Sequence, residues 1–132
     1  MSMTFNRELF IEAYEILDGI PDERFNLSEI ANKKELDCGT LACGMGWLAM
    51  HPKFQALGLT LEEAGDEGVR VALPGFEFLP VSGYDTIARE LFGFSGTLAP
   101  YHIFRTRCLE ERGTDKQVLL KRMRNYLRGM PV

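Results

Sequence analysis

The stretch Cys38-Gly39-Thr40-Leu41-Ala42-Cys43-Gly44-Met45-Gly46-Trp47-Leu48-Ala49-Met50 decides the fold that we expect for this chain. It predicts a helix from about Thr40 to Met50 that is apolar on every side, and such a helix is buried. A glycine inside a helix costs about 0.5–1 kcal/mol relative to alanine. Because Gly44 and Gly46 both carry this cost, we expect a neighbouring backbone to approach their face closely. The stretch is therefore placed at the centre of the core.

Capping residues and apolar side chains at helical spacing predict further helices around this centre. The expected elements are a helix from near Asn6 to Gly19, a short helix Pro52–Leu57, one turn from Thr60 closed by Gly65, a helix Tyr84–Phe92 capped by Ser82, a helix Leu98–Arg105 capped by Thr97, and a helix from Thr114, with a capping box, to Arg128.

Alternating apolar residues predict one small β-hairpin near residues 69–79, in which Val69–Leu73 and 76–79 are joined by Pro74-Gly75. Arg70 would then face Glu77 across the hairpin. With 132 residues, of which 45% are hydrophobic, the chain is long enough to bury a sizeable core. We therefore expect a single domain over residues 1–132. Its fold class is mainly α: a compact helical domain around the buried Gly/Ala/Cys-rich helix, with the hairpin beside it.

Charge is unevenly distributed along the chain. The net charge is −4, but residues 101–132 hold eight Lys and Arg against three acids, a net charge of +5. The basic region 105–128, with Arg122 and Arg124, is thus a candidate surface for nucleic acid or for an acidic partner. The simpler interpretation, which we favour, is that this tail is a solvated face or packs against the acidic body. The acidity of the whole chain also disfavours a non-specific binder of phosphates.

The cysteines Cys38, Cys43 and Cys108 are odd in number, which favours free thiols in a reducing, cytoplasmic setting. An alternative is a tetrahedral zinc site in which Cys38 and Cys43 are joined by His51 or His102. A second alternative is a nucleophilic Cys38 at a helix N-terminus. Because the spacing matches no standard zinc motif, we expect buried thiols, with no metal, no catalytic residue and no cofactor. The sequence holds no phosphate-binding glycine loop and no apolar stretch near the ~18 residues of a membrane span.

Aromatic residues are dense between residues 76 and 104. Most are expected in the core. If the tip of the hairpin projects, Phe76 and Phe78 become anchors for a partner protein, because aromatic side chains dominate binding hot spots. Phe76, Phe78, Arg122 and Arg124 are therefore the candidate partner-binding residues.

The run Cys38-Gly39-Thr40-x-x-Cys43-x-x-Gly46-Trp47-x-Ala49 resembles a motif of small uncharacterised bacterial and phage proteins. In these proteins a lead-in, matched here by Phe25-Asn26-Leu27, precedes a C-G-T-x-x-C-x-x-G helix. Later helices are matched by Ala56–Leu59 and Ala88–Phe94. The likeness covers residues 25–104, and the hairpin-like segment at 69–79 departs from it. The resemblance implies a phage, prophage or bacterial cytoplasmic context and no particular chemistry.

Together these features predict a small, cytoplasmic, non-enzymatic protein that binds another protein, as an accessory factor of a phage or mobile element. The alternatives are a metal- or thiol-dependent protein that uses Cys38, Cys43 and a histidine, and a nucleic-acid binder that uses region 105–128.

Overall fold

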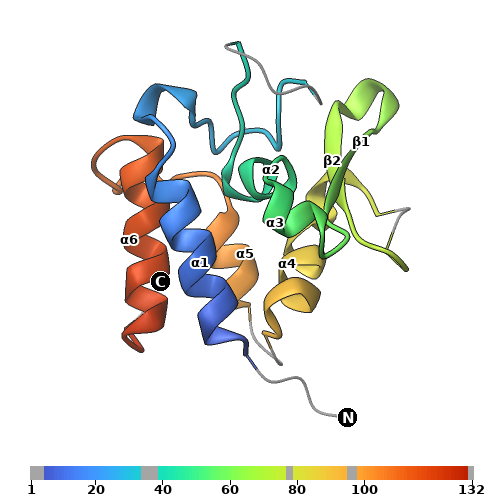
Figure 1. Ribbon diagram of the computed structural model, residues 1–132. Coiled ribbons are helices and arrows are strands. Elements are labelled where there is room, and N and C mark those ends of the chain that lie inside the picture. The colour runs from blue at the N-terminus through green and yellow to red at the C-terminus, as the bar shows by residue number, and fades with distance from the viewer. Residues whose placement is uncertain (1–4, 34–38, 77–78, 95–97, 131–132) are drawn as a thin grey trace.

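The computed structural model describes residues 5–33, 39–76, 79–94 and 98–130 (Figure 1). Within these ranges the chain is mainly helical, with one two-stranded antiparallel sheet, which confirms the prediction of a mainly α fold with one small hairpin. The helices are α1 (Arg7–Asp18), α2 (Gly44–Ala49), α3 (Pro52–Gln55), α4 (Tyr84–Phe92), α5 (Ala99–Phe104) and α6 (Asp115–Leu127). The strands are β1 (Thr60–Glu63) and β2 (Val69–Ala72), and short 3-10 turns lie at Asp22–Arg24, Gly65–Glu67 and Val81–Gly83.

Helix caps confirm several predicted boundaries. The Asn6 side chain accepts a hydrogen bond from the Leu9 amide at the start of α1. At the start of α6, Thr114 and Gln117 form the reciprocal capping box. The predicted cap of α4 is wrong, because Gly83 and not Ser82 is its N-cap residue. Thr97, the predicted cap of α5, lies outside the described residues.

The central helix α2 begins at Gly44, four residues later than predicted. Residues Thr40–Cys43 are not helical, because their backbone pairs with the segment that follows α1. The Ala42 amide donates to the carbonyl of Arg24 at 3.2 Å, and the Cys43 amide donates to that of Ile30 at 3.2 Å. These bonds hold Cys43 in an extended conformation as the N-cap residue. All six residues of α2 are buried.

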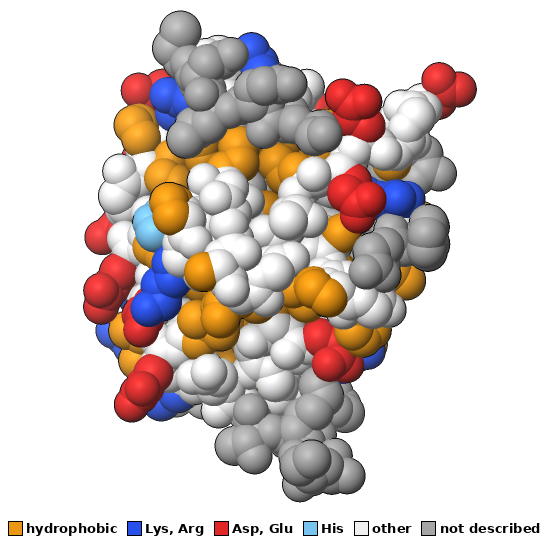
Figure 2. Space-filling model, turned by 45° about the vertical axis from the view of Figure 1, so that its right-hand side comes forward, with side chains coloured by type: hydrophobic (Ala, Val, Ile, Leu, Met, Phe, Trp, Pro, Cys, Tyr) orange, Lys and Arg blue, Asp and Glu red, His pale blue; other side chains and the backbone are white. Residues whose placement is uncertain are grey.

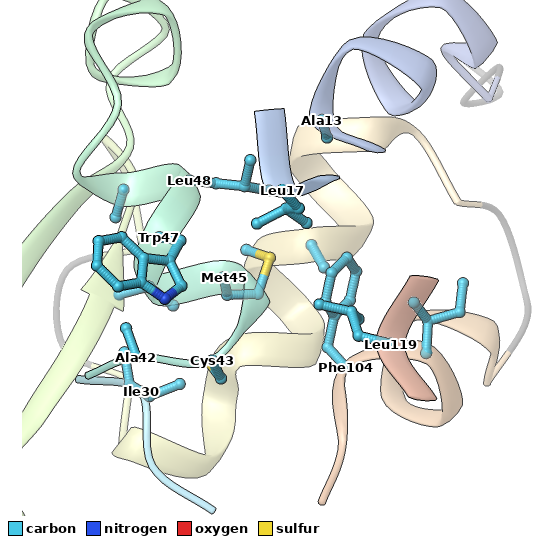
Figure 3. Packing of buried hydrophobic residues seen from close by; sticks show 14 of the residues in the cluster. Ala13, Leu17, Ile30, Ala42, Cys43, Met45, Trp47, Leu48, Phe104 and Leu119 are labelled. Atoms are coloured by element: carbon cyan, nitrogen blue, oxygen red, sulfur yellow. The ribbon is translucent and has the colours of Figure 1, made fainter. Parts of the chain in front are cut away.

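The small residues of α2 accept close neighbours. A Cβ atom on Gly46 would collide with the carbonyl oxygen of Ile30 and would lie 2.9 Å from its carbonyl carbon. The expected close approach of a second backbone is therefore present at Gly46. Gly44 instead faces side chains, because a Cβ atom there would lie 2.7 Å from Cδ2 of Leu119. In Figure 3, Met45 lies between Trp47 and Phe104, with Leu17 and Leu48 above it.

The β-hairpin has a different partner strand from the one predicted. Strand β1 pairs with β2 in antiparallel register, with Leu61 opposite Val71 and Glu62 opposite Arg70. The predicted helical turn at Thr60 is therefore wrong. Of the hairpin predicted at 69–79, the first strand is present as β2, and residues 77–78 of the second lie outside the described residues. Nη2 of Arg70 lies 3.6 Å from the carboxylate of Glu62. Glu77, the predicted partner of Arg70, lies outside the described residues.

The turn between the two strands allows β1 to pair with β2. Gly65 and Gly68 both adopt positive φ, at 62° and 95°, a conformation that other residues rarely adopt. They reverse the chain over a few residues, and the Ala64 amide bonds to the carbonyl of Gly68 at 2.7 Å. The sequence Thr60–Glu63 satisfies both a capping box and a strand, and the tertiary position of Leu61 favours the strand.

The two ends of the chain pack together, since α1 lies against α6 as well as α2 (Figure 1). Nη1 of Arg7 donates to the carbonyl of Leu127 at 3.0 Å, and Nζ of Lys116 donates to that of Asp18 at 2.8 Å. The hairpin contacts α2 and α4, and α5 lies between α4 and α6 in the contact pattern. In the part of the chain that the structure describes, no helix is both long and apolar enough to cross a lipid bilayer.

Candidate functional site

Two hollows border α2, and they are the candidate sites. The larger, which we call the Cys43 pocket, has a volume of about 520 Å³. It is lined by Leu27, Ser28, Glu29, Ile30, Cys43, Pro80, Ser82, Tyr84, Phe104 and Thr106. The second, which we call the Trp47 groove, has a volume of about 420 Å³, and a smaller hollow of about 250 Å³ also contacts Met50. The Trp47 groove is lined by Glu15, Ile16, Gly19, Ile20, Trp47, Met50, His51 and Pro52, and the smaller hollow by Ala49, Met50, Gln55, Thr60 and Leu61.

The Cys43 pocket brings together segments that are distant in sequence. The backbone bonds between Cys43 and Ile30 fix the wall formed by residues 27–30. Helix α4 supplies Tyr84 at its first position, and α5 supplies the buried Phe104 at its last. The pocket is thus built on the ends of α2, α4 and α5, with apolar side chains for most of its surface.

The Cys43 thiol and the Tyr84 phenol of this pocket are held in their neutral forms. Burial raises the pKa of the Cys43 thiol to about 11. Burial, with smaller contributions from Tyr101 and Asp85, raises the pKa of the Tyr84 phenol to about 12. Because a thiolate is the reactive form of cysteine, Cys43 is a poor nucleophile near neutral pH. The pocket offers weak hydrogen-bond donors and an apolar surface instead of a reactive group.

Two described residues of the alternative metal site, Cys43 and His51, are not brought together. Cys43 and His51 lie at opposite ends of α2 and line different hollows. Nδ1 of His51 accepts a hydrogen bond from the Lys53 amide at 3.1 Å, because His51 is the N-cap residue of α3. His102 stacks edge-on against Tyr101, and Cys38 lies outside the described residues. Among the described residues, no three His, Cys, Asp or Glu side chains form a metal-binding group.

Arg122, predicted as a partner-binding residue, is a structural residue of the core. Its side chain is only 4% exposed. Nη1 donates to the carbonyls of Ile103 and Arg105, at 3.0 and 2.6 Å, and Nη2 donates to that of Thr106 at 3.0 Å. Both oxygens of Glu111 accept from the same guanidinium, at 2.9 and 2.6 Å. Since every donor group is directed inward, Arg122 is not available to a partner.

The other predicted partner-binding residues have different positions. Arg124 is partly exposed, and its Nη1 donates to the Tyr14 hydroxyl at 2.8 Å. Phe76 is half-buried and packs against the core, so it does not project as an anchor. Phe78 lies outside the described residues. Phe76 therefore does not provide an exposed aromatic surface for a partner.

Most basic side chains of region 105–128 are used inside the fold. Arg105 donates to Sγ of Cys108 at 2.8 Å, and Arg107 donates to the carbonyls of Gly113 and Glu111 at 2.6 and 2.7 Å. Lys116 and Arg122 are similarly engaged. In the described part of the chain, the basic side chains of this region without such contacts are Arg112, Lys121 and Arg128. The local excess of positive charge thus stabilises the fold, and little of it forms a phosphate-binding surface.

Leu98 and Tyr101 are exposed apolar residues that sequence reasoning missed. They are 66% and 45% exposed. They lie three residues apart, and this spacing places them on one face of α5, whereas Pro100, Ile103 and Phe104 face the core. The three-residue spacing of Leu98 and Tyr101 was the feature of the sequence that could have indicated this shared exposed face. Tyr101 lies near enough to Tyr84, in the wall of the Cys43 pocket, to raise its pKa.

No protein-family model matches this chain, and neither a curated protein nor a solved structure shows significant similarity to it.

Proposed function

We propose that this chain is a non-enzymatic binding protein of the bacterial or phage cytoplasm, and that an apolar side chain of a partner protein enters the Cys43 pocket. In this proposal the buried helix α2 is the interior scaffold of the domain, and its N-cap residue, Cys43, supplies part of the pocket wall. The cytoplasmic setting follows from the odd number of cysteines. The bacterial or phage context follows from the resemblance of the Cys38–Ala49 run.

The observation that carries the proposal is the position of an exposed apolar strip beside the pocket. Tyr101 is 45% exposed and Leu98 is 66% exposed; Tyr101 lies on α5, which ends in the pocket residue Phe104, and Leu98 is the N-cap residue of that helix. A small ligand would need only the pocket itself for binding. A pocket with an adjacent exposed aromatic residue is typical of a protein interface, in which a buried anchor is surrounded by further contacts.

The neutral forms of the Cys43 thiol and the Tyr84 phenol support binding over catalysis. The raised pKa values of Cys43 and Tyr84 keep both groups protonated at pH 7. A general base or nucleophile works best when its pKa is near the working pH. Glu29 is the acidic side chain of the pocket lining, and its amide neighbour Asn26 donates to it at 3.3 Å. In this proposal these groups line the site of an apolar guest and take part in no reaction.

The proposal is tested by quantitative capture of partners from a bacterial lysate with matched variants. Ser82→Phe fills the mouth of the pocket, and Tyr101→Ala removes the adjacent contact. Leu57→Ala is the matched control, because Leu57 is an exposed leucine (49%) that does not line the pocket. Melting temperatures show whether each variant is folded.

We expect the wild type and Leu57→Ala to capture the same protein, and both pocket variants to lose it. Capture that is equal in all four proteins, or no capture by the wild type, would contradict the proposal.

A further inference from the structure

Leu109 is the most exposed large apolar residue in the described part of the chain, with an exposure of 102%. Exposed apolar side chains are common on proteins, and Figure 2 shows several separate groups of them on one face of this molecule. Exposure alone therefore marks no docking surface. Leu109 differs from the other exposed residues in its position, because it lies in the loop 105–114 that follows the pocket residue Phe104 and joins α5 to α6.

Hydrogen bonds hold this loop on both sides of Leu109. The Cys108 amide donates to Oε1 of Glu111 at 2.8 Å, and the Glu111 amide donates back to the carbonyl of Cys108 at 3.1 Å. Nη2 of Arg107 donates to the carbonyl of Glu111 at 2.7 Å, and the Glu111 carboxylate is itself bound by the buried Arg122. The loop therefore presents Leu109 in a fixed position, so that binding of this side chain costs little ordering entropy.

Leu109 lies beside the Cys43 pocket but not inside it. Thr106, three residues before Leu109, lines the pocket. Because a chain spans at most about 3.6 Å per residue, the Cα atoms of Thr106 and Leu109 are no more than about 11 Å apart. The full exposure of Leu109 shows that its side chain does not enter the pocket of its own molecule. An apolar hollow and a rigid, unburied leucine thus lie next to each other on one chain, and a two-fold dimer requires a self-complementary patch of this kind.

We propose that the Cys43 pocket receives Leu109 from a second copy of this chain, in a two-fold dimer in which each Leu109 enters the pocket of the other copy. The inference rests on the proposed function, since it names a second copy as an occupant of the same pocket. The contact forms twice in such a dimer, and the assembly closes at two copies. A different protein that enters the pocket then competes with the second copy.

The charges near the two surfaces are compatible with this contact. Glu29 lines the pocket, is exposed, and accepts a hydrogen bond from the Asn26 side chain at 3.3 Å. Glu110 and Arg112 follow Leu109 in the loop, and both are exposed. Within the described ranges, none of these three charged side chains forms an ion pair. Since Glu110 and Arg112 balance each other, the loop approaches Glu29 without net repulsion, and Arg112 supplies a charge of opposite sign.

Sedimentation of the purified full chain tests the proposal. We expect the wild type to change from monomer to dimer as its concentration rises through the micromolar range, without larger assemblies. Leu109→Ser removes both buried leucines of the dimer and should weaken association by about 100-fold or more. Leu57→Ser is the matched control, because Leu57 is an exposed leucine (49%) that does not line the pocket, and it should weaken association by less than about two-fold. A wild type that stays monomeric, or equal weakening by the two serine variants, would overturn the proposal.

A mixture of two variants tests the contact itself. Ser82→Phe fills the mouth of the pocket and keeps Leu109, whereas Leu109→Ser keeps the pocket and loses its guest. Each variant alone should be monomeric where the wild type is dimeric. An equimolar mixture should form a heterodimer with one intact contact, weaker than the wild-type dimer. Melting temperatures show whether both variants are folded, and a mixture of folded variants that does not associate would refute the contact.

The same variants separate this inference from the proposed function. Leu109→Ser keeps the Cys43 pocket and should still capture a protein from the bacterial lysate. Capture by Leu109→Ser together with a monomeric wild type would support the proposed function and overturn this inference. A dimer that is lost in both Leu109→Ser and Ser82→Phe, with no protein captured by Leu109→Ser, would support this inference and contradict the capture that the proposed function expects.

Discussion

The carbonyl group of Ile30 occupies the space that a Cβ atom on Gly46 would need. The same carbonyl accepts a hydrogen bond from the Cys43 amide at 3.2 Å, so it cannot move away without breaking the pairing that begins α2. One backbone group thus fixes the residue type at position 46 and the start of the central helix.

Alanine substitutions at three glycines should give graded losses of stability. Gly46→Ala forces two backbones apart, and we expect it to lower the free energy of unfolding by about 3 kcal/mol or more. Gly44→Ala meets the end of the Leu119 side chain, which can move, and alanine favours the helix, so the net change should stay within about 1 kcal/mol. Gly19→Ala makes only ordinary contacts and should change stability by less than about 0.5 kcal/mol. Urea unfolding measures all three, and equal losses at Gly46 and Gly19 would contradict the close approach.

Removal of the Arg122 guanidinium should destabilise the fold strongly. Arg122→Met leaves Glu111 and three backbone carbonyls without their donor. Breaking a buried ion pair in this way costs about 3–5 kcal/mol. Lys121→Met is the control, because the Lys121 side chain, next to Arg122 in the sequence, is exposed. This substitution should change the free energy of unfolding by no more than about 0.5 kcal/mol. Similar unfolding midpoints for the two variants would contradict the burial of Arg122.

The Arg122–Glu111 pair should also make stability depend on pH in the acid range. Hydrogen bonds from Arg122 lower the pKa of Glu111 from 4.5 to about 2. An acid whose pKa is lower in the folded state stabilises the protein above its unfolded pKa, and this contribution is lost as the pH falls towards the folded value. The difference in unfolding free energy between the wild type and Glu111→Gln should therefore be constant above about pH 5.5 and shrink between pH 4.5 and pH 2. A difference that stays constant to pH 2 would contradict the pairing.

Iodoacetamide should distinguish the cysteines of the native protein. Burial raises the pKa of Cys43 to about 11, so this thiol should remain unmodified at pH 8, whereas the partly exposed Cys108 should react. Peptide mapping by mass spectrometry reports each site separately. In urea Cys43 and Cys108 should react at similar rates, which serves as the control. Rapid modification of native Cys43 would show an ionised, accessible thiol and would reopen the thiol-dependent alternative.

Local signals were sufficient for the long helices. Asn6 and Gly19 bound α1, and the Thr114 capping box begins α6, because these features depend on contacts within a few residues. The two strands were harder to place. Thr60–Glu63 fits a helical turn and a strand equally well, and only its pairing with Val69–Ala72 and the packing of Leu61 decide between them.

The candidate sites depended on tertiary structure that the sequence did not specify. Arg122 was interpreted as surface charge, although it lies between Leu119 and Met123 on the buried face of α6. That spacing was a signal, but the carbonyls that justify a buried cation come from residues 103–106 and could not be foreseen. The Cys43 pocket likewise combines the ends of three helices with residues 27–30, so no local motif marks it.

The hydrogen bonds that join the last helix to the beginning of the chain have a consequence for biosynthesis. Asp115 accepts from the Leu27 amide across 88 residues, and Arg7 reaches the Leu127 carbonyl across 120. Until α6 has been synthesised, the Leu27 amide and the Arg7 guanidinium hydrogen-bond to water instead. The contacts of the native fold can therefore be completed only after α6 has been synthesised.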